Sequence, residues 1–133
     1  MANSIHFSDT ELACPHCGIN DCTEELVDAL ESLRTAAGNV PIRVNSAYRC
    51  PEHNAAVGGV PNSEHVSGLA ADIVISGLLA QQMYKLAQQI PTIKGIGVDV
   101  RKGYVHVDVR QNSAKWCYDE NGKWCAWDST LDA

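Results

Sequence analysis

The stretch Ser63-Glu64-His65-Val66-Ser67-Gly68-Leu69-Ala70-Ala71-Asp72-Ile73 decides the fold of this chain. It begins in a polar loop and ends in an apolar run that is typical of a buried strand. His65 lies at the end of the loop, Asp72 lies just inside the strand, and a turn at Gly68 can bring the two side chains together. An imidazole and a carboxylate are both ligands for a borderline divalent metal such as zinc. Taken alone, the stretch favours the ordinary alternative, a solvated histidine in a loop.

A second stretch places a histidine and an aspartate on one face of a predicted strand. Tyr104-Val105-His106-Val107-Asp108-Val109-Arg110 alternates with the period of a strand. Its valines point into a core, whereas Tyr104, His106 and Asp108 point together to the other side. His65, Asp72 and His106 then form a His-Asp-His set. Three protein ligands with one open position are the pattern of a catalytic zinc site rather than a structural one.

These stretches belong to a longer series of motifs. The series reads Ser46-Ala47-Tyr48-Arg49, Asn54-Ala55-Ala56-Val57-Gly58-Gly59-Val60-Pro61-Asn62-Ser63, His65-x-x-Gly68-x-Ala70-x-Asp72-Ile73 and His106. From about residue 26 to 110 it resembles the M15 family of zinc peptidases, and in particular the D-Ala-D-Ala carboxypeptidases and related small peptidoglycan peptidases. The resemblance implies a small α+β fold, one catalytic Zn²⁺ on His65, Asp72 and His106, and hydrolysis of cell-wall peptides.

The length and periodicity of the chain fit this fold. A chain of 133 residues has the length of a single domain. Apolar residues recur at helical spacing over residues 21–38 and 78–90, which predicts two main helices. We expect them to pack on an antiparallel sheet that bears the zinc site. The domain would include a cysteine-containing segment, residues 1–22, and a C-terminal hairpin within residues 111–133.

The two central strands are expected to form a hairpin. Arg101-Lys102-Gly103 fits a three-residue loop with glycine in the left-handed position. This loop pairs Val98 with His106 and Val100 with Tyr104. Asp99 then faces away from the zinc side, and a slip of one residue would reverse that.

The zinc site needs a group that accepts a proton from water. Many M15 enzymes carry an acidic residue three positions before the last zinc histidine, but this chain has Gly103 there. Asp108 is the first candidate for the general base, with a role in orienting the zinc ligands as the alternative. Asp99 is the second candidate.

Three residues are candidates for substrate binding. Arg49 follows the predicted strand at residues 41–46, and its planar guanidinium suits a substrate carboxylate. We therefore expect Arg49 to take part in catalysis as well as in substrate binding. Ser63 either caps the following turn or bonds to substrate, and Tyr104 shares the face of His106.

The sequence does not decide whether the six cysteines form disulfides, remain free thiols or bind a metal. Cys14 and Cys17 have a spacing that suits a zinc knuckle or a redox pair, and Cys22 follows them. A closed zinc site needs a fourth ligand, and His16 is poorly placed between two of the others. The favoured interpretation is a loop with a disulfide or with packed thiols, and a structural metal is the alternative. In the tail, Cys117 is expected opposite Cys125, with all three tryptophans nearby as packing or as the rim of a groove.

Composition excludes some functions. The formal net charge of −6 argues against nucleic-acid binding, which depends on Lys and Arg. No run reaches the roughly 18 apolar residues of a membrane helix, and residues 1–9 show no secretory signal. We therefore expect a monomer that is made in the cytoplasm, does not insert into a membrane, and reaches the wall after release, as a phage lysin or a virion part does.

The expected activity is a D,D-carboxypeptidase or an endopeptidase acting on peptidoglycan peptides. The competing hypotheses are a non-catalytic zinc module that binds wall peptide on the same scaffold, and a virion protein.

Overall fold

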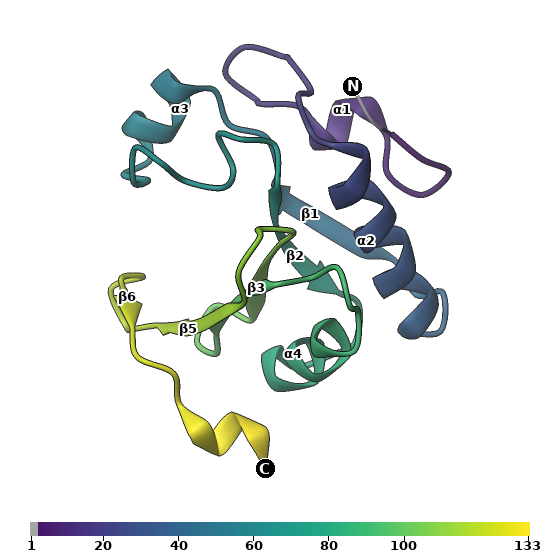
Figure 1. Cartoon of the computed structure of the whole chain (residues 1–133), viewed down its shortest axis with the longest axis vertical. Helices are drawn as coiled ribbons and strands as arrows, with labels where there is room; N and C mark the ends of the chain where they lie inside the picture. The colour runs from purple at the N-terminus through teal and green to yellow at the C-terminus, as the bar shows by residue number, and fades with distance from the viewer. Residues whose placement is uncertain (1–2) are drawn as a thin grey trace.

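Six strands form one sheet in the order β1-β2-β4-β3-β5-β6 in the computed structural model, which describes residues 3–133 (Figure 1). Neighbouring strands run antiparallel, except that β3 and β5 run parallel. The expected α+β class is confirmed, with a mixed and mostly antiparallel sheet. The strands are β1 (Ile42–Ser46), β2 (Ala70–Ile75), β3 (Gly95–Asp99), β4 (Tyr104–Asp108), β5 (Ala114–Tyr118) and β6 (Trp124–Cys125).

The two long helices are those that the sequence predicts. The helical elements are α1 (Asp9–Leu12), α2 (Glu24–Ala36), α3 (Pro51–Ala56), α4 (Ala80–Gln88) and a final 3₁₀ turn, η1 (Ser129–Asp132). Helix α2 begins three residues later than expected, because Thr23 caps it by accepting the backbone N–H of Leu26 at 3.2 Å. At α1, Ser8 and Glu11 form the reciprocal capping box that their spacing predicts.

The core lies between one face of the sheet and the helices α2 and α4. Figure 1 shows these helices on the same side of the sheet, away from α3, and the C-terminal turn η1 lies beside α4, where the Tyr84 hydroxyl donates to Asp132 at 2.5 Å. Val105 and Val107 of β4 are fully buried in this core, together with Ile73 and Ile75 of β2. Because side chains alternate along a strand, His106 must point to the opposite face. The burial of the valines therefore places the polar residues of β4 on the face that α2 and α4 leave uncovered.

The register of the β3–β4 hairpin differs from the prediction. Gly97 pairs with His106, Val98 with Val105 and Asp99 with Tyr104, so the expected pairing was wrong by one residue. The loop has four residues, 100–103, instead of three. Directly opposite residues share a face, so Asp99 lies on the same face as His106 rather than away from it.

The tail forms the predicted hairpin and also joins the main sheet. Cys117 pairs with Cys125 and Tyr118 with Trp124, as expected. The Gly122 N–H donates to the Asp119 carbonyl at 2.9 Å, which closes the turn. The parallel pairing of β5 with β3 was not expected, and it brings residues 114–118 beside the central strands.

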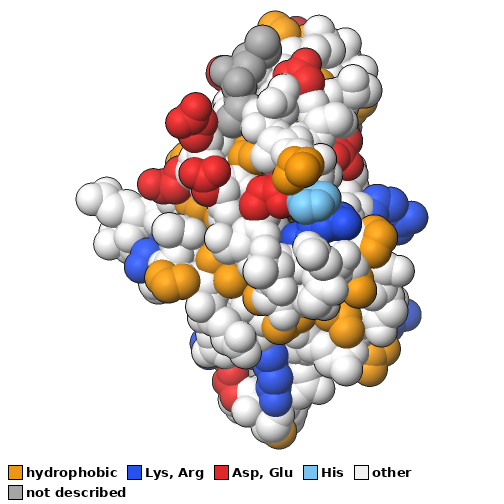
Figure 2. All heavy atoms as spheres, turned by 90° about the vertical axis from the view of Figure 1, so that its right-hand side faces the viewer, with side chains coloured by type: hydrophobic (Ala, Val, Ile, Leu, Met, Phe, Trp, Pro, Cys, Tyr) orange, Lys and Arg blue, Asp and Glu red, His pale blue; other side chains and the backbone are white. Residues whose placement is uncertain are grey.

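Acidic side chains are unevenly distributed over the surface. Figure 2 shows them gathered in the upper half of the face that forms the right-hand side of Figure 1. Among residues 3–133, no helix is long and apolar enough to cross a membrane.

Candidate active site

Three predicted ligands meet on the uncovered face of the sheet. One ligand atom from each of His65, Asp72 and His106 lies within 4.8 Å of the other two. Asp72 on β2 and His106 on β4 are directly paired across the sheet. His65 reaches them from the loop between α3 and β2, and both histidines are buried.

Hydrogen bonds fix how the two histidines point. Nδ1 of His65 lies 2.7 Å from the Ala47 carbonyl oxygen, which can only accept, so Nδ1 carries the hydrogen. Nε2 of His65 is then free to ligate, and it lies 3.2 Å from Oδ1 of Asp72. The same oxygen is 3.1 Å from Nδ1 of His106. Two imidazole nitrogens and one carboxylate oxygen therefore converge on one point, which fits a tetrahedral zinc ion with an open position.

Asp108 holds the other nitrogen of His106. Its Oδ2 lies 2.7 Å from Nε2 of His106. Nε and Nη2 of Arg110 donate to the two Asp108 oxygens at 2.8 and 2.7 Å, and the carboxylate is fully buried. Burial acts to raise the pKa of Asp108, but the hydrogen bonds from His106 and Arg110 lower it well below its usual range. Asp108 thus remains ionised and keeps Nδ1 of His106 free to ligate.

His106 is charged at neutral pH when no metal is bound. Burial acts to lower its pKa, but the hydrogen bonds to Asp108 and Asp72 raise it to about 9. The pKa of Asp72 is shifted downward instead. Burial acts to raise it, but the charge of His65 and the hydrogen bonds from His106 and His65 lower it below its usual range. The cluster is a cation between two carboxylates, and zinc binding must displace the proton of His106.

Two glycines of β3 make room for these contacts. A Cβ at Gly95 would collide with the carboxylate of Asp108. A Cβ at Gly97 would lie 2.5 Å from Nε1 of Trp116. The absence of both side chains therefore lets Asp108 and the β5 aromatic residue pack onto the centre of the site.

Aromatic side chains form a wall beside His106. The ring centroid of Trp116 lies 5.2 Å from that of His106, and Tyr104 stacks on Tyr118 at 5.8 Å. Burial and the nearby charge of Asp72 raise the pKa of Tyr118 to about 12, and the same causes raise that of Tyr104. Both phenols therefore stay protonated over the physiological range and are available as hydrogen-bond donors.

Arg49 lies at the edge of this site, and no acidic side chain among residues 3–133 forms an ion pair with it. Its Nη2 donates to Oγ of Ser63 at 3.3 Å, and its buried Nε has no partner among residues 3–133. Ser63 also accepts the backbone N–H of His65 at 3.2 Å, so the turn-capping alternative for Ser63 matches its contacts. The positive charge of Arg49 acts to lower the pKa of both Tyr104 and Tyr118, which places it within electrostatic range of the aromatic wall.

Comparison with known proteins agrees with this geometry. A family model described as Peptidase M15 matches residues 5–108, a range that includes all three converging side chains. The chain belongs to the peptidase M15 family. A segment of 59 residues is 42% identical to the zinc D-Ala-D-Ala carboxypeptidase of Streptomyces albus G. The match covers 44% of this chain and 22% of that relative, so the chain corresponds to only part of its length. The family and the relative are both described as peptidases, and the name of the relative gives zinc as its metal.

The sequence of this M15 family member did not point to Arg110 and Tyr118 as residues of the site, and it left Trp116 open between packing and the rim of a groove. Alternation over residues 114–118 places Trp116 and Tyr118 on one face, which is a usable local signal. Their position beside His106 depends on the parallel pairing of β5 with β3, and no local pattern encodes that pairing. Arg110 is recognised only through its contacts with Asp108.

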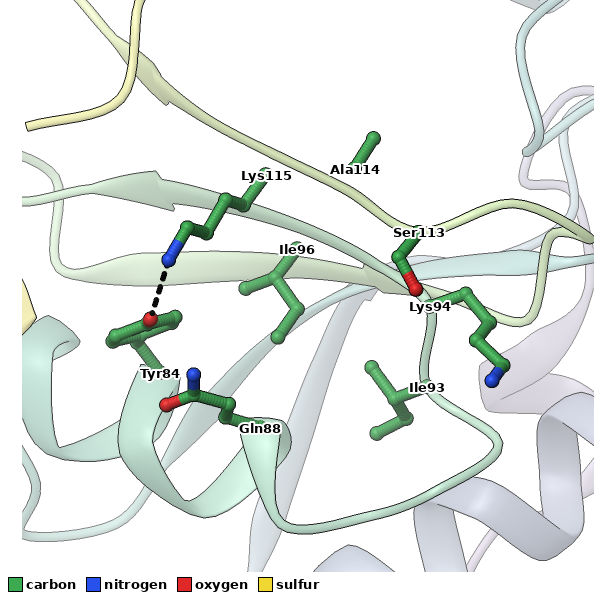
Figure 3. A pocket seen from close by; sticks show the side chains of 8 residues that line it. All are labelled: Tyr84, Gln88, Ile93, Lys94, Ile96, Ser113, Ala114 and Lys115. Atoms are coloured by element: carbon green, nitrogen blue, oxygen red, sulfur yellow. Dashed lines mark hydrogen bonds between the residues drawn. The ribbon is translucent and has the colours of Figure 1, made fainter.

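A cavity elsewhere in the chain is lined by none of the residues of the candidate active site. It has a volume of about 420 Å³ and lies between α4 and the strands β3 and β5 (Figure 3). Ile96 and Lys115 line it, and Nζ of Lys115 donates to the hydroxyl of Tyr84 at 3.3 Å. Ile96 alternates with Gly97, so this cavity lies on the helix side of the sheet, opposite His65, Asp72 and His106.

Proposed function

We propose that this chain is a zinc-dependent D,D-carboxypeptidase that hydrolyses the peptides of peptidoglycan. The convergence of His65, Asp72 and His106, with His106 held by a buried carboxylate, carries the proposal. The carboxypeptidase name of the Streptomyces relative supports the reaction. The guanidinium of Arg49, which forms no ion pair among residues 3–133, supports the choice of carboxypeptidase over endopeptidase, since it can bind a terminal carboxylate through paired N–H donors.

The protein groups around the metal have separate tasks. Zinc bound to the three ligands would acidify a water molecule and polarise the scissile carbonyl. Arg49 binds the terminal carboxylate of the substrate, and Ser63 holds its guanidinium. Tyr104 and Tyr118 exclude bulk water from the edge of the site and supply hydroxyl donors.

We assign the transfer of the proton to Asp99 and the orientation of His106 to Asp108. The two Asp108 oxygens already accept bonds from His106 and Arg110, so that carboxylate is poorly suited to take a proton from water. Asp99 shares the face of His106, and diagonal positions on paired strands are about 7–8 Å apart. One Asp99 oxygen accepts the Lys102 N–H at 2.9 Å, while the other is buried with no partner among the described residues.

The test is release of D-alanine from a synthetic stem peptide that ends in D-Ala-D-Ala. We expect release by the zinc-loaded protein, its loss on chelation, and its recovery when zinc is restored. A peptide with an amidated C-terminus is the matched control, and it should react poorly because Arg49 loses its partner. Binding of the peptide without turnover by fully zinc-loaded protein would overturn the proposal and favour the non-catalytic wall-binding module.

A further inference from the structure

Three of the six cysteines meet at a point outside the candidate active site. The sulfur atoms of Cys14, Cys17 and Cys50 all lie within 4.8 Å of one another. Cys14 and Cys50 are buried, and their sulfurs are 3.7 Å apart, whereas Cys17 is exposed at the surface. Two of these residues come from the N-terminal loop, and the third lies just before α3.

The loop of residues 14–18 turns back on itself so that both of its cysteines face Cys50. The Gly18 N–H donates to the Cys14 carbonyl at 2.8 Å, and Gly18 has a φ of +75° that favours glycine. The Cys14 N–H donates to the Ile19 carbonyl at 2.8 Å, which closes the turn from the other side. The turn is therefore set by the backbone, independently of any bond between sulfur atoms.

Backbone N–H groups point at the buried sulfurs. The Cys50 N–H donates to Sγ of Cys14 at 3.5 Å, and the His53 N–H donates to Sγ of Cys50 at 3.5 Å. The thiolate is the form that ligates metals, and N–H donors aimed at a sulfur favour its negative charge.

An imidazole is available for a fourth position. Ligand atoms of His16, Cys50 and Glu52 also lie within 4.8 Å of one another, and Nε2 of His16 is 3.8 Å from Oε2 of Glu52. Spacing along the sequence counts against His16 as a partner of Cys14 and Cys17. Cys50 belongs to both groups, since its sulfur lies within 4.8 Å of the ligand atoms of Cys14 and Cys17 and also of His16. His16 is exposed, so a movement of its side chain toward the three sulfurs would complete the set.

We propose that Cys14, Cys17, Cys50 and His16 bind a second, structural zinc ion. Three thiolates and one imidazole are a closed tetrahedral set for this metal. A disulfide between Cys14 and Cys50 would leave Cys17 without a role, whereas a metal uses all three sulfurs.

The site would fasten the N-terminal segment to the loop that carries Arg49. Cys50 directly follows Arg49, and the Tyr48 N–H donates to the Leu12 carbonyl at 3.2 Å. Metal binding at residues 14–17 would thus stabilise the position of Arg49. The existence of the site does not depend on the proposed peptidase activity.

Cobalt substitution tests the site separately from the His-Asp-His site. Only thiolate ligands give an intense near-ultraviolet charge-transfer band with Co²⁺, and the active site has no sulfur. We expect the band in the full chain and in His106→Ala, and its loss in Cys17→Ser. Cys17 is exposed, so this substitution should leave the fold intact, as circular dichroism would show. Cys125→Ser is the matched control, and it should keep the band.

Zinc content supplies the second measurement. The full chain should bind two zinc ions, while Cys17→Ser and His106→Ala should each bind one. Zinc X-ray absorption of His106→Ala should show three sulfur neighbours and one nitrogen. A single zinc ion in the full chain with no thiolate band, or a Cys14–Cys50 disulfide in protein isolated with zinc and without oxidant, would overturn the proposal.

Discussion

The Asp108 carboxylate has both oxygens engaged, one with His106 and each with a nitrogen of Arg110. Replacing Asp108 with Asn removes the charge that holds the ring of His106 with Nδ1 toward the metal. Zinc affinity should fall about 10- to 100-fold, as for other groups that orient a ligand. Competition with a fluorescent chelator measures this, and excess zinc should restore most of the turnover. Unchanged zinc affinity with lost turnover would instead make Asp108 the proton acceptor.

Substitution of Asp99 should lower turnover without changing zinc binding, in contrast to substitution of Asp108. Asp99→Asn keeps the size of the side chain but removes the basic oxygen, so kcat should fall by about 10²–10⁴. Zinc content should be unchanged, since Asp99 contacts none of the three ligands. Asp119→Asn, in the tail turn, is the matched control and should keep full activity. Wild-type kcat for Asp99→Asn would exclude Asp99 from proton transfer.

Arg49 depends on the shape of its side chain as well as on its charge. Arg49→Lys keeps the charge but loses the planar pair of donors, so kcat/KM on the D-Ala-D-Ala peptide should fall about 10- to 100-fold. Steady-state kinetics on this peptide and on its amidated form provide the measurement. The loss should be much smaller with the amide, which lacks the carboxylate. An equal loss on both peptides would mean that Arg49 does not recognise the carboxylate.

At the scale of elements, β3 lies between β4, which carries His106, and β5, which carries Trp116. The absence of a side chain at Gly97 allows Trp116 to pack closely against β3. A Cβ at Gly97 would lie 2.5 Å from Nε1 and 2.7 Å from Cε2 of Trp116. Gly97→Ala should therefore push the aromatic wall away from His106 and lower the free energy of unfolding by about 1–3 kcal/mol. Urea denaturation measures the loss. Adding Trp116→Leu should recover part of it, because the collision is removed. Additive losses in the double variant would contradict the packing explanation.

At the scale of the whole molecule, the charge state of the zinc site couples stability to pH. His106 has its pKa raised to about 9 from an unfolded value of about 6.5. Its contribution is therefore complete below pH 6.5 and is lost as pH rises through 9. Asp72 and Asp108 have lowered pKa values, so their contribution is present above about pH 3.9 and is lost in acid. In chelator, the melting temperature should fall between pH 6.5 and 9.

Zinc should act in the opposite direction over the same range. Ligation requires neutral His106, so zinc affinity should rise with pH while the stability of the metal-free protein falls. His106→Gln is the control, and its metal-free melting temperature should vary less between pH 6.5 and 9. A flat profile for the unsubstituted protein in chelator would show that His106 is not held as a cation between the two carboxylates.

The tertiary structure decided how distant segments meet at the site. A loop of four residues instead of three shifted the β3–β4 register by one, which turned Asp99 onto the face of His106. The parallel pairing of β3 with β5 placed Trp116 beside the zinc ligands. The contact of Cys50 with the N-terminal cysteines is of the same kind. Such pairings depend on loop geometry and on packing between segments that are far apart, which no local period contains.

The sequence by itself determined the main elements and the candidate ligand set, His65, Asp72 and His106. The alternation of residues 104–110 identified the buried valines and the face of His106, because the period of a strand is a local property. Helical spacing identified α2 and α4, and the Ser8–Glu11 capping box was readable for the same reason. His65 and Asp72 were recognisable from chemistry and motif order. Only the folded structure shows that both Asp108 oxygens are bonded while one Asp99 oxygen has no partner among residues 3–133, because burial and hydrogen bonding exist only once the chain has folded.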